Sequence, residues 1–297
     1  MTAPPARNSS APVLALLASA VLWGMSWWPL KQFSAVGISG NAMALVSYGL
    51  LALVGLPVLW AQRALWRPRV GLLLLIALLG GWANTAFVNA LVLGDVVRVM
   101  LLFYLAPVWG ILAGRLFLHE PITPRRALAV VLALFGAATL LGGPAALAVP
   151  PTPIDLLALS AGMAFALNNV STRAAHGVPL ASKTLIVFVG CAVVAGAAAW
   201  SQGNGIPPLR APTWGLLALF SLTWLGLATL ATQFGVSHLE AGRAAVLLIL
   251  ELVAAVVSAV VIGGESLTAR ELIGGGLIAS AALIEIRGNA TRKERWT

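Results

Sequence analysis

The chain has 297 residues, of which 60% are hydrophobic and 9% are charged. Soluble domains carry about 25% charged residues, so a water-soluble fold of this length is excluded. The net charge of +9 is better explained by Lys and Arg in cytoplasmic loops than by nucleic-acid binding. The single cysteine, Cys191, excludes a disulfide framework and a cysteine-based metal site. We therefore expect a polytopic membrane protein without metal or cofactor.

The first apolar segment, "APVLALLASAVLWG", follows Arg7 and resembles a signal peptide with "ASA" as a cleavage site. However, the apolar run continues to about Leu30, which is longer than a signal-peptide core. We interpret it as the first membrane span, preceded by a flexible N-terminal tail over residues 1–11.

Polar residues, Pro and Gly divide the rest of the chain into further apolar segments of bilayer-spanning length. Short joints such as "LGDVVR" and "HLEAGR" force neighbouring helices to run antiparallel. The predicted spans are 12–33, 41–61, 70–91, 95–117, 126–143, 153–174, 181–200, 213–235, 243–263 and 269–286.

The basic residues set the expected orientation of these spans. With the N-terminus in the cytoplasm, 14 of the 18 Lys and Arg residues fall on the inner side. This bias favours ten spans with both termini cytoplasmic, including a basic tail over 288–297. We therefore expect a multi-pass protein of the bacterial inner membrane.

An internal repeat divides the chain into two halves. A constant offset of 145 residues aligns polar positions of 95–137 with those of 240–282, and an offset of 142 aligns Lys31 with Arg173. We therefore expect two five-helix repeats, 12–143 and 153–287, joined by a linker over 144–152. The polar pairs at the first offset are Asp95 and Glu240, Arg98 and Arg243, Glu120 and Glu265, Thr123 and Thr268, and Arg125 and Arg270.

Five spans per repeat is an odd number, so the second repeat must cross the membrane in the inverted sense. Inverted repeats are typical of secondary transporters, whose substrate site lies near the midplane between the halves. The predicted fold is thus an all-α integral membrane protein, with ten transmembrane helices as two inverted five-helix repeats around a central cavity.

A duplicated pattern links the chain to a known family. It reads "YLAPVWGILAGRLFLHEPIT" at 104–123 and, more weakly, "ILELVAAVVSAVVIGGESLT" at 249–268. This pattern resembles the EamA branch of the drug/metabolite transporter superfamily, and within it the bacterial aromatic amino acid exporters. The second copy departs from the first, with Leu252 in place of Pro107 and Glu251 in place of Ala106.

Glu251 is the one carboxylate in the apolar run 244–261. Ionisable groups inside a membrane are costly and mark functional pathways by default. Three interpretations remain open: a protonated acid that locks two helices, a partner for a substrate ammonium, or a group that couples transport to protons.

Buried amides form a second set of candidates. Asn84 and Asn89 lie in the third span, and Asn168 and Asn169 in the sixth. Asn in a membrane helix often binds neighbouring helices together. We expect Asn84, Asn89 and Asn168 to contribute to the cavity.

Aromatic residues form the third set, since indole and phenol rings suit a flat apolar substrate. The candidates could equally be packing residues. They are Trp23 and Trp27 in the first span, Tyr104 and Trp109 in the fourth, and Trp224 in the eighth.

Other features receive structural interpretations. Pro29 and Pro107 are hinge candidates, because proline kinks helices. Glu120 is expected in a loop or helix cap, and Arg173 at a helix end where its side chain snorkels to the interface. The run "GGGLIAS" at 274–280 predicts close helix packing around Gly275 and Gly276, with a homodimer contact as one outcome.

The predicted function is export of amino acids, aromatic and other apolar ones preferred, by alternating access. No Walker A, HExxH or GxSxG sequence is present, which argues against an ATPase or an intramembrane hydrolase. The alternatives are a multidrug or cationic small-molecule exporter of the same fold and a channel-like facilitator. The expected partners are an amino acid substrate and the lipid bilayer, with no nucleic acid, and the expected assembly is a monomer or weak homodimer.

Overall fold

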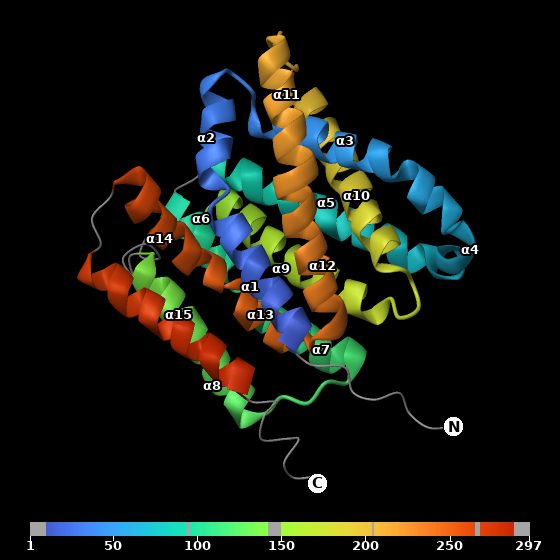
Figure 1. Ribbon diagram of the computed structural model, residues 1–297. Coiled ribbons are helices and arrows are strands. Elements are labelled where there is room, and N and C mark those ends of the chain that lie inside the picture. The colour runs from blue at the N-terminus through green and yellow to red at the C-terminus, as the bar shows by residue number, and fades with distance from the viewer. Residues whose placement is uncertain (1–9, 94–95, 142–149, 204, 265–267, 288–297) are drawn as a thin grey trace.

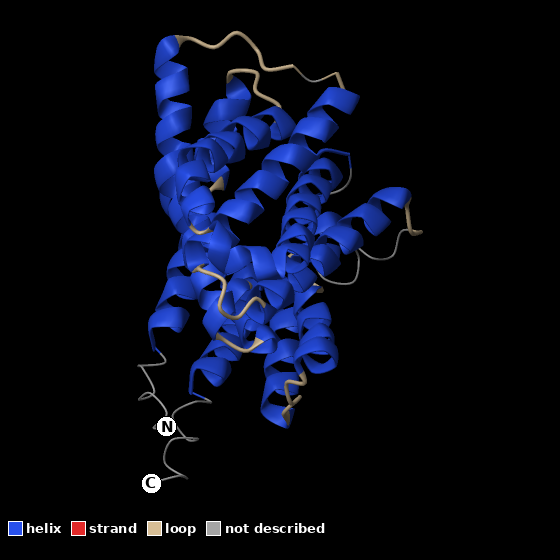
Figure 2. Cartoon of the chain, turned by 90° about the vertical axis from the view of Figure 1, so that its right-hand side faces the viewer, coloured by secondary structure: helices blue, strands red, loops and turns tan. Residues whose placement is uncertain are grey.

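The structure is a computed structural model that describes residues 10–93, 96–141, 150–203, 205–264 and 268–287. Within these ranges the chain is helical and no strand occurs (Figures 1 and 2). The helices are α1 (Ser10–Gly24), α2 (Trp27–Ala35), α3 (Gly40–Ala61), α4 (Arg63–Trp66), η1 (Arg67–Arg69), α5 (Val70–Leu93), α6 (Val96–Phe103), α7 (Ala106–Leu118), α8 (Pro124–Leu140), α9 (Pro153–Ala174), α10 (Leu180–Ser201), α11 (Ala211–Leu219), the π-helical turn η3 (Phe220–Leu225), α12 (Gly226–His238), α13 (Ala241–Leu248), α14 (Leu250–Gly263) and α15 (Ala269–Arg287).

Local capping signals set where several of these helices begin. The hydroxyls of Ser39 and Thr123 accept hydrogen bonds from the first turns of α3 and α8. Thr152 and Asp155 form a reciprocal capping box at the start of α9. Each cap satisfies amides that the helix itself leaves unpaired.

The chain is a multi-pass membrane protein. Eight of the described helical segments are long and apolar enough to cross a bilayer. Large apolar side chains such as Leu53, Phe135 and Val261 are exposed on their outer faces, as lipid contact requires. The remaining two predicted spans correspond to α8, which has 17 residues, and α15, whose apolar part is Leu272–Ile284. The ten-span count depends on this pair and stays a prediction.

Four of the predicted spans are interrupted rather than continuous. The first breaks at Met25 and Ser26, between α1 and α2, and the fourth at Tyr104 and Leu105, between α6 and α7. The eighth passes through η3, and the ninth breaks at Ile249. Pro29 and Pro107 lie just after the first two breaks and explain them. A proline lacks the amide hydrogen, and its ring displaces the carbonyl four residues earlier.

Contacts between the repeats follow the offset of 145 residues. Helices from corresponding spans pack against each other: α3 against α10, α7 of the fourth predicted span against α13 of the ninth, and α8 against α15. The equivalent helices α8 and α15 run antiparallel, because Gly136 faces Ile278 whereas Gly274 faces Leu140. Equivalent helices that pair antiparallel are related by a two-fold axis in the membrane plane, the geometry of an inverted repeat.

The pair α8 and α15 lies at the lower left of Figure 1 and packs against α13 and α14. A Cβ added to Gly136 would lie 2.8 Å from the Gly274 carbonyl oxygen, so the two backbones touch. By contrast, nothing lies within 4 Å of a Cβ added to Gly275 or Gly276. The close packing predicted for the "GGGLIAS" run therefore exists, but Gly274 makes it, one residue earlier than expected.

Candidate functional site

A cavity lies between the two repeats and is called the central cavity below. It comprises about 880 Å³ of empty space, its open side included. Its walls come from both repeats, which places it at the interface that the inverted repeat predicts. The lining residues are Trp23, Tyr48, Gly80, Ala83, Asn84, Phe87, Phe103, Phe165, Asn168, Asn169, Val187, Cys191, Thr229, Thr232, Gln233, Leu248 and Glu251.

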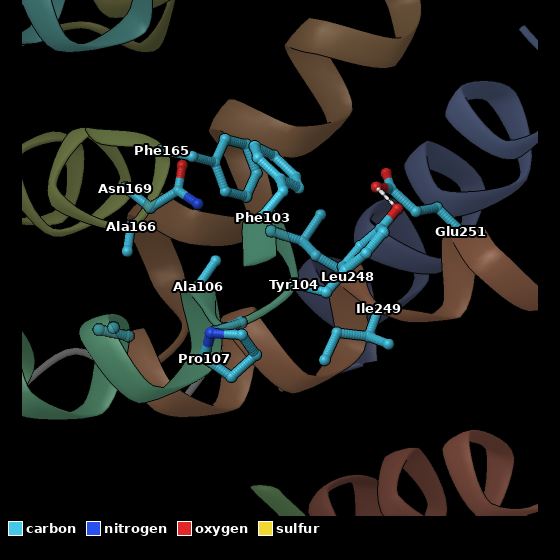
Figure 3. A pocket seen from close by; sticks show the side chains of 13 residues that line it. Phe103, Tyr104, Ala106, Pro107, Phe165, Ala166, Asn169, Leu248, Ile249 and Glu251 are labelled. Atoms are coloured by element: carbon cyan, nitrogen blue, oxygen red, sulfur yellow. Dashed lines mark hydrogen bonds between the residues drawn. The ribbon is translucent and has the colours of Figure 1, made fainter. Parts of the chain in front are cut away.

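A narrower recess, the side pocket, continues from the central cavity. Phe103, Phe165, Asn169, Leu248 and Glu251 line both spaces and form the boundary between them. In Figure 3, Phe103 and Phe165 lie between Asn169 on one side and Glu251 on the other. The remaining walls of the side pocket are mostly small: Tyr104, Ala106, Pro107, Gly110, Ala166, Ala241, Ala245 and Ile249.

Glu251 lies at this boundary because of a break in its helix. It is in the first turn of α14, two residues after the break at Ile249. The Tyr104 hydroxyl donates a hydrogen bond to its Oε1 (Figure 3). The backbone of Glu251 is packed against α1, since a Cβ on Gly24 would meet the Glu251 carbonyl oxygen at 2.5 Å.

The break beside Tyr104 is supported in the same way. A Cβ on Gly162 of α9 would lie 2.4 Å from the Phe103 carbonyl oxygen, the carbonyl that Pro107 displaces. A glycine thus lets a neighbouring helix reach the exposed backbone at each break. Helix breaks of this kind form the substrate sites of many transporters.

Asn84 and Asn168 both line the central cavity. Asn84 Nδ2 donates to the Tyr48 hydroxyl at 3.3 Å. The side-chain oxygens of Asn84, Asn168 and their neighbour Asn169 are buried without a hydrogen-bond partner, as are those of Thr229 and Gln233. Unpaired buried polar groups are rare and indicate an unmet partner such as water or ligand.

Asn89 lies away from both spaces. It exchanges hydrogen bonds with Asn41 and accepts one from Gln202 Nε2 at 2.6 Å. This polar cluster joins α3, α5 and α10 near their ends. Its geometry is that of helix-to-helix adhesion.

The predicted aromatic residues fall into two groups. Trp23 lines the central cavity, its Nε1 3.3 Å from the Thr232 hydroxyl, and Tyr104 lines the side pocket. Trp27 and Trp224 instead line neither space. Trp27 donates a hydrogen bond to the Ser258 hydroxyl, and Trp224 donates one to the Leu22 carbonyl. Trp109 also lines neither, and its Nε1 is buried without a partner.

Several lining residues were not among the predicted candidates. Tyr48, Phe87, Phe103 and Phe165 contribute rings to the two spaces. Thr232 hydrogen bonds to Ser19 at 2.5 Å and so joins α12 to α1. The sequence carries a usable signal for Thr229, Thr232 and Gln233, because they are polar residues within an apolar span.

An ion pair lies behind Ala241, at the end of the side pocket that is called the closed end below. Arg173 Nε donates to Glu120 Oε1 at 2.5 Å, and Ala241 N donates to Glu120 Oε2 at 2.8 Å. Glu120 is 9% exposed and lies against Gly114. Glu120 thus caps the N-terminus of α13, a helix of the other repeat. Arg173 pairs with Glu120 instead of reaching the membrane interface.

Further polar contacts strengthen this closed end. Arg126 pairs with Glu240 across the two repeats, and Arg173 Nη1 donates to the Leu239 carbonyl. Lys183 Nζ donates to Ser237 Oγ at 2.8 Å and to the Thr172 carbonyl. Glu265, the repeat equivalent of Glu120, lies outside the described residues.

The lining chemistry identifies no cofactor or metal site. Within the described ranges, no group of three His, Cys, Asp or Glu side chains could hold a metal ion. What the two spaces offer is one carboxylate, several amides and hydroxyls, and aromatic rings.

Two helical repeats with a cavity at their interface are typical of a membrane transporter. The model of the EamA-like transporter family matches residues 10–142 and again residues 152–286. The chain therefore belongs to the EamA-like transporter family, with two copies of its repeat.

One solved structure, described only as "Crystal structure of protein", has the same fold. It matches with a TM-score of 0.74 over 94% of this chain and 98% of that chain, at 21% sequence identity. At that identity the likeness shows the fold alone. No curated protein matches the sequence.

Proposed function

We propose that the protein is a secondary transporter that exports amino acids, aromatic and other apolar ones preferred, by alternating access. One observation carries the proposal: the carboxylate of Glu251 lies where the two spaces meet, between helix breaks of the two repeats. A substrate held there would touch both repeats at once, so rocking of the repeats would transfer it from one side to the other.

The substrate class follows from the lining. Glu251 would hold the ammonium group, and the amides of Asn168 and Asn169 would hold the carboxylate. The rings of Trp23, Phe103 and Phe165 would enclose the side chain. The resemblance of the sequence to the YddG type of bacterial aromatic amino acid exporter supports the same class.

The direction of transport rests on the orientation predicted from the basic residues. In that orientation the closed end, with Glu120 and Arg173, faces the cytoplasm of a bacterium. The described conformation would then be the one in which cytoplasmic access is shut. Reversal of this closure would load substrate from inside, as an exporter requires.

The energy source has two candidate forms. Glu251 is suitably placed to exchange a proton for substrate, which would make the protein an antiporter. A facilitator that equilibrates its substrate would need no such exchange. Counterflow measured at two pH values separates these forms.

The test of the function is a counterflow screen in proteoliposomes with all twenty amino acids. We expect accelerated uptake of labelled phenylalanine when the vesicles are preloaded with phenylalanine, tyrosine, tryptophan or leucine, and saturation at high concentration. Failure of every amino acid to drive counterflow would refute the substrate. Uptake that never saturates would indicate a channel-like facilitator.

A second candidate, export of cationic drugs, has a specific observation in its favour. Among the described residues that line the two spaces, Glu251 is the charged side chain and none is Lys or Arg. A large aromatic cation would pair with Glu251 and stack on the rings. Inhibition of phenylalanine counterflow by aromatic quaternary ammonium compounds, but not by amino acids, would favour this candidate.

A further inference from the structure

The charge of the site is unbalanced. Glu251 accepts one hydrogen bond, from Tyr104, and makes no other hydrogen bond or ion pair in the described part of the chain. Arg173 and Lys183 are basic residues of the described chain that already have partners. Arg173 holds Glu120 and the Leu239 carbonyl, and Lys183 holds Thr172 and Ser237.

A ligand with a protonated amine would neutralise the charge of Glu251. A ligand that also carries a carboxylate would leave the site with a net negative charge again. One ammonium group neutralises the site, since it brings one positive charge to one negative charge. The carboxylate of an amino acid brings a second negative charge into a place of low dielectric constant, where no guanidinium or ammonium group of the lining can pair with it. Buried charges without a partner of opposite sign are unfavourable.

The neutral polar groups of the lining point the same way. Five buried side-chain oxygens, those of Asn84, Asn168, Asn169, Thr229 and Gln233, lack a hydrogen-bond partner. They lie on α5, α9 and α12 and thus surround the central cavity from three helices. An N–H donor on the ligand would satisfy such oxygens, but a quaternary ammonium group has no N–H to give.

The body of the ligand must be apolar. Trp23, Tyr48, Phe87, Phe103 and Phe165 contribute rings to the two spaces. Phe103 lies 4.3 Å from Phe87 and 5.6 Å from Phe165, measured between ring centroids. A ligand ring can join this cluster next to the carboxylate of Glu251.

We propose that the site recognises a primary ammonium group on an aromatic body and does not require a carboxylate. Arylalkylamines such as 2-phenylethylamine are then ligands in their own right, at least as strong as the amino acids that carry the same ring. This inference rests on the proposed function, because it concerns the same site, and it narrows the chemistry by which that site selects.

The experiment is inhibition of labelled phenylalanine counterflow by compounds that share one ring and differ in their charged groups. The set is unlabelled phenylalanine, 2-phenylethylamine, N,N,N-trimethyl-2-phenylethylammonium and 3-phenylpropionate. Because a neutral amine crosses bilayers unaided, the readout is inhibition in the first seconds rather than amine flux.

We expect 2-phenylethylamine to inhibit at or below the concentration needed for phenylalanine. The trimethyl compound should be about tenfold weaker because the lining oxygens stay unpaired, and 3-phenylpropionate should be weaker by about a hundredfold. Equal inhibition by 3-phenylpropionate and 2-phenylethylamine would overturn the inference and leave amino acid transport intact.

Direct binding keeps the inference testable if phenylalanine is not transported. Thermal unfolding of the purified protein in detergent is followed with the same four compounds. A rise in Tm with 2-phenylethylamine that exceeds the rise with 3-phenylpropionate supports the inference even if the proposed substrate is wrong. The opposite order, or no rise with the amine at saturating concentration, overturns it. In Glu251→Gln, which has no charge to neutralise, the amine should lose its advantage over 3-phenylpropionate.

Discussion

The Tyr104 hydroxyl donates a hydrogen bond to Glu251 Oε1 and so joins the helix breaks of the two repeats. Under the offset of 145 residues, Tyr104 corresponds to Ile249, where the second break lies. The contact therefore lies close to the axis that relates the repeats. A group bound at Glu251 therefore lies where the two repeats meet and can contact both of them.

Replacing Tyr104 by Phe tests this contact. The variant Tyr104→Phe keeps the ring but removes the donor, so the carboxylate loses the bond that fixes its orientation. Hydrogen bonds to charged groups contribute about 1.5–3 kcal/mol, and we expect KM for phenylalanine to rise by about tenfold with little change in maximal rate. Steady-state counterflow measures both constants. An unchanged KM would mean that the hydroxyl does not orient the acid for binding.

Replacing Glu251 by Gln tests the charge itself. The near-isosteric Glu251→Gln should fold normally and lose at least about 90% of phenylalanine counterflow, because the ammonium loses its ionic partner. The residual rate should no longer depend on pH if this acid also carries the proton. Size-exclusion profiles control for folding. Wild-type rates with a wild-type pH profile would leave Glu251 a structural residue that locks two helices.

Two tryptophans four residues apart provide a matched pair. Trp23 lines the central cavity, whereas Trp27 donates to Ser258 and lines neither space. We expect Trp23→Leu to reduce phenylalanine uptake about fivefold more than alanine uptake, since ring contacts contribute about 1 kcal/mol. Trp27→Leu should lower uptake of both to the same extent, through lost packing. The comparison needs uptake of the two labelled amino acids in parallel, and a selective loss in Trp27→Leu would reverse the assignment.

The ion pair of Glu120 and Arg173 should hold the closed end shut. A cysteine at Ala245, which lines the side pocket, can report on this in a Cys191→Ala background. We expect slow labelling by a membrane-impermeant maleimide and labelling about tenfold faster in Glu120→Gln, because unpairing Arg173 destabilises the closed state.

The exchanged pair, Glu120→Arg with Arg173→Glu, is the control. It should label more slowly than Glu120→Gln, since the ionic attraction is restored, although the bonds to Ala241 N and to the Leu239 carbonyl are lost. Fast labelling in both the single and the exchanged variants would mean that the identity of the side chains, rather than their pairing, keeps this end closed.

Adjacent glycines of α15 give a test of the packing. A Cβ at Gly274 would lie 2.6 Å from the Leu140 amide nitrogen, whereas one at Gly275 meets nothing within 4 Å. Gly274→Ala should therefore destabilise the protein by about 1–3 kcal/mol through overpacking, and Gly275→Ala should be neutral or slightly stabilising because Ala favours helix. Thermal unfolding in detergent compares the two. Equal Tm values would contradict the backbone contact between α8 and α15.

Features of the fold that leave a polar or periodic trace could be predicted from the sequence. The repeat offset could be read from matched polar residues. Under the same offset, the break at Tyr104 corresponds to the break at Ile249, although the residue Ile249 itself does not indicate a break. Glu251 stands out because a lone carboxylate in an apolar run has few explanations.

The aromatic lining could not be predicted in the same way. A helix that is apolar all round has no amphipathic face to set its rotation, so Trp27 and Trp224 look like Trp23 in the sequence. Phe103 and Phe165 face the cavity while Phe135 faces outward, and all three are one residue type. Only the packing of α1, α9 and α14 around the breaks determines which aromatic side chains line the cavity and which do not.

The interruption at Ile249 differs in kind from the one before Pro107. Proline makes the earlier interruption permanent, because no amide hydrogen is available to restore the missing bond. Around Ile249 every residue keeps its amide hydrogen, so we expect that this segment can form one continuous helix in another conformation. We therefore expect the repeat that carries Glu251 to change its helix geometry during transport more than the repeat that carries Pro107.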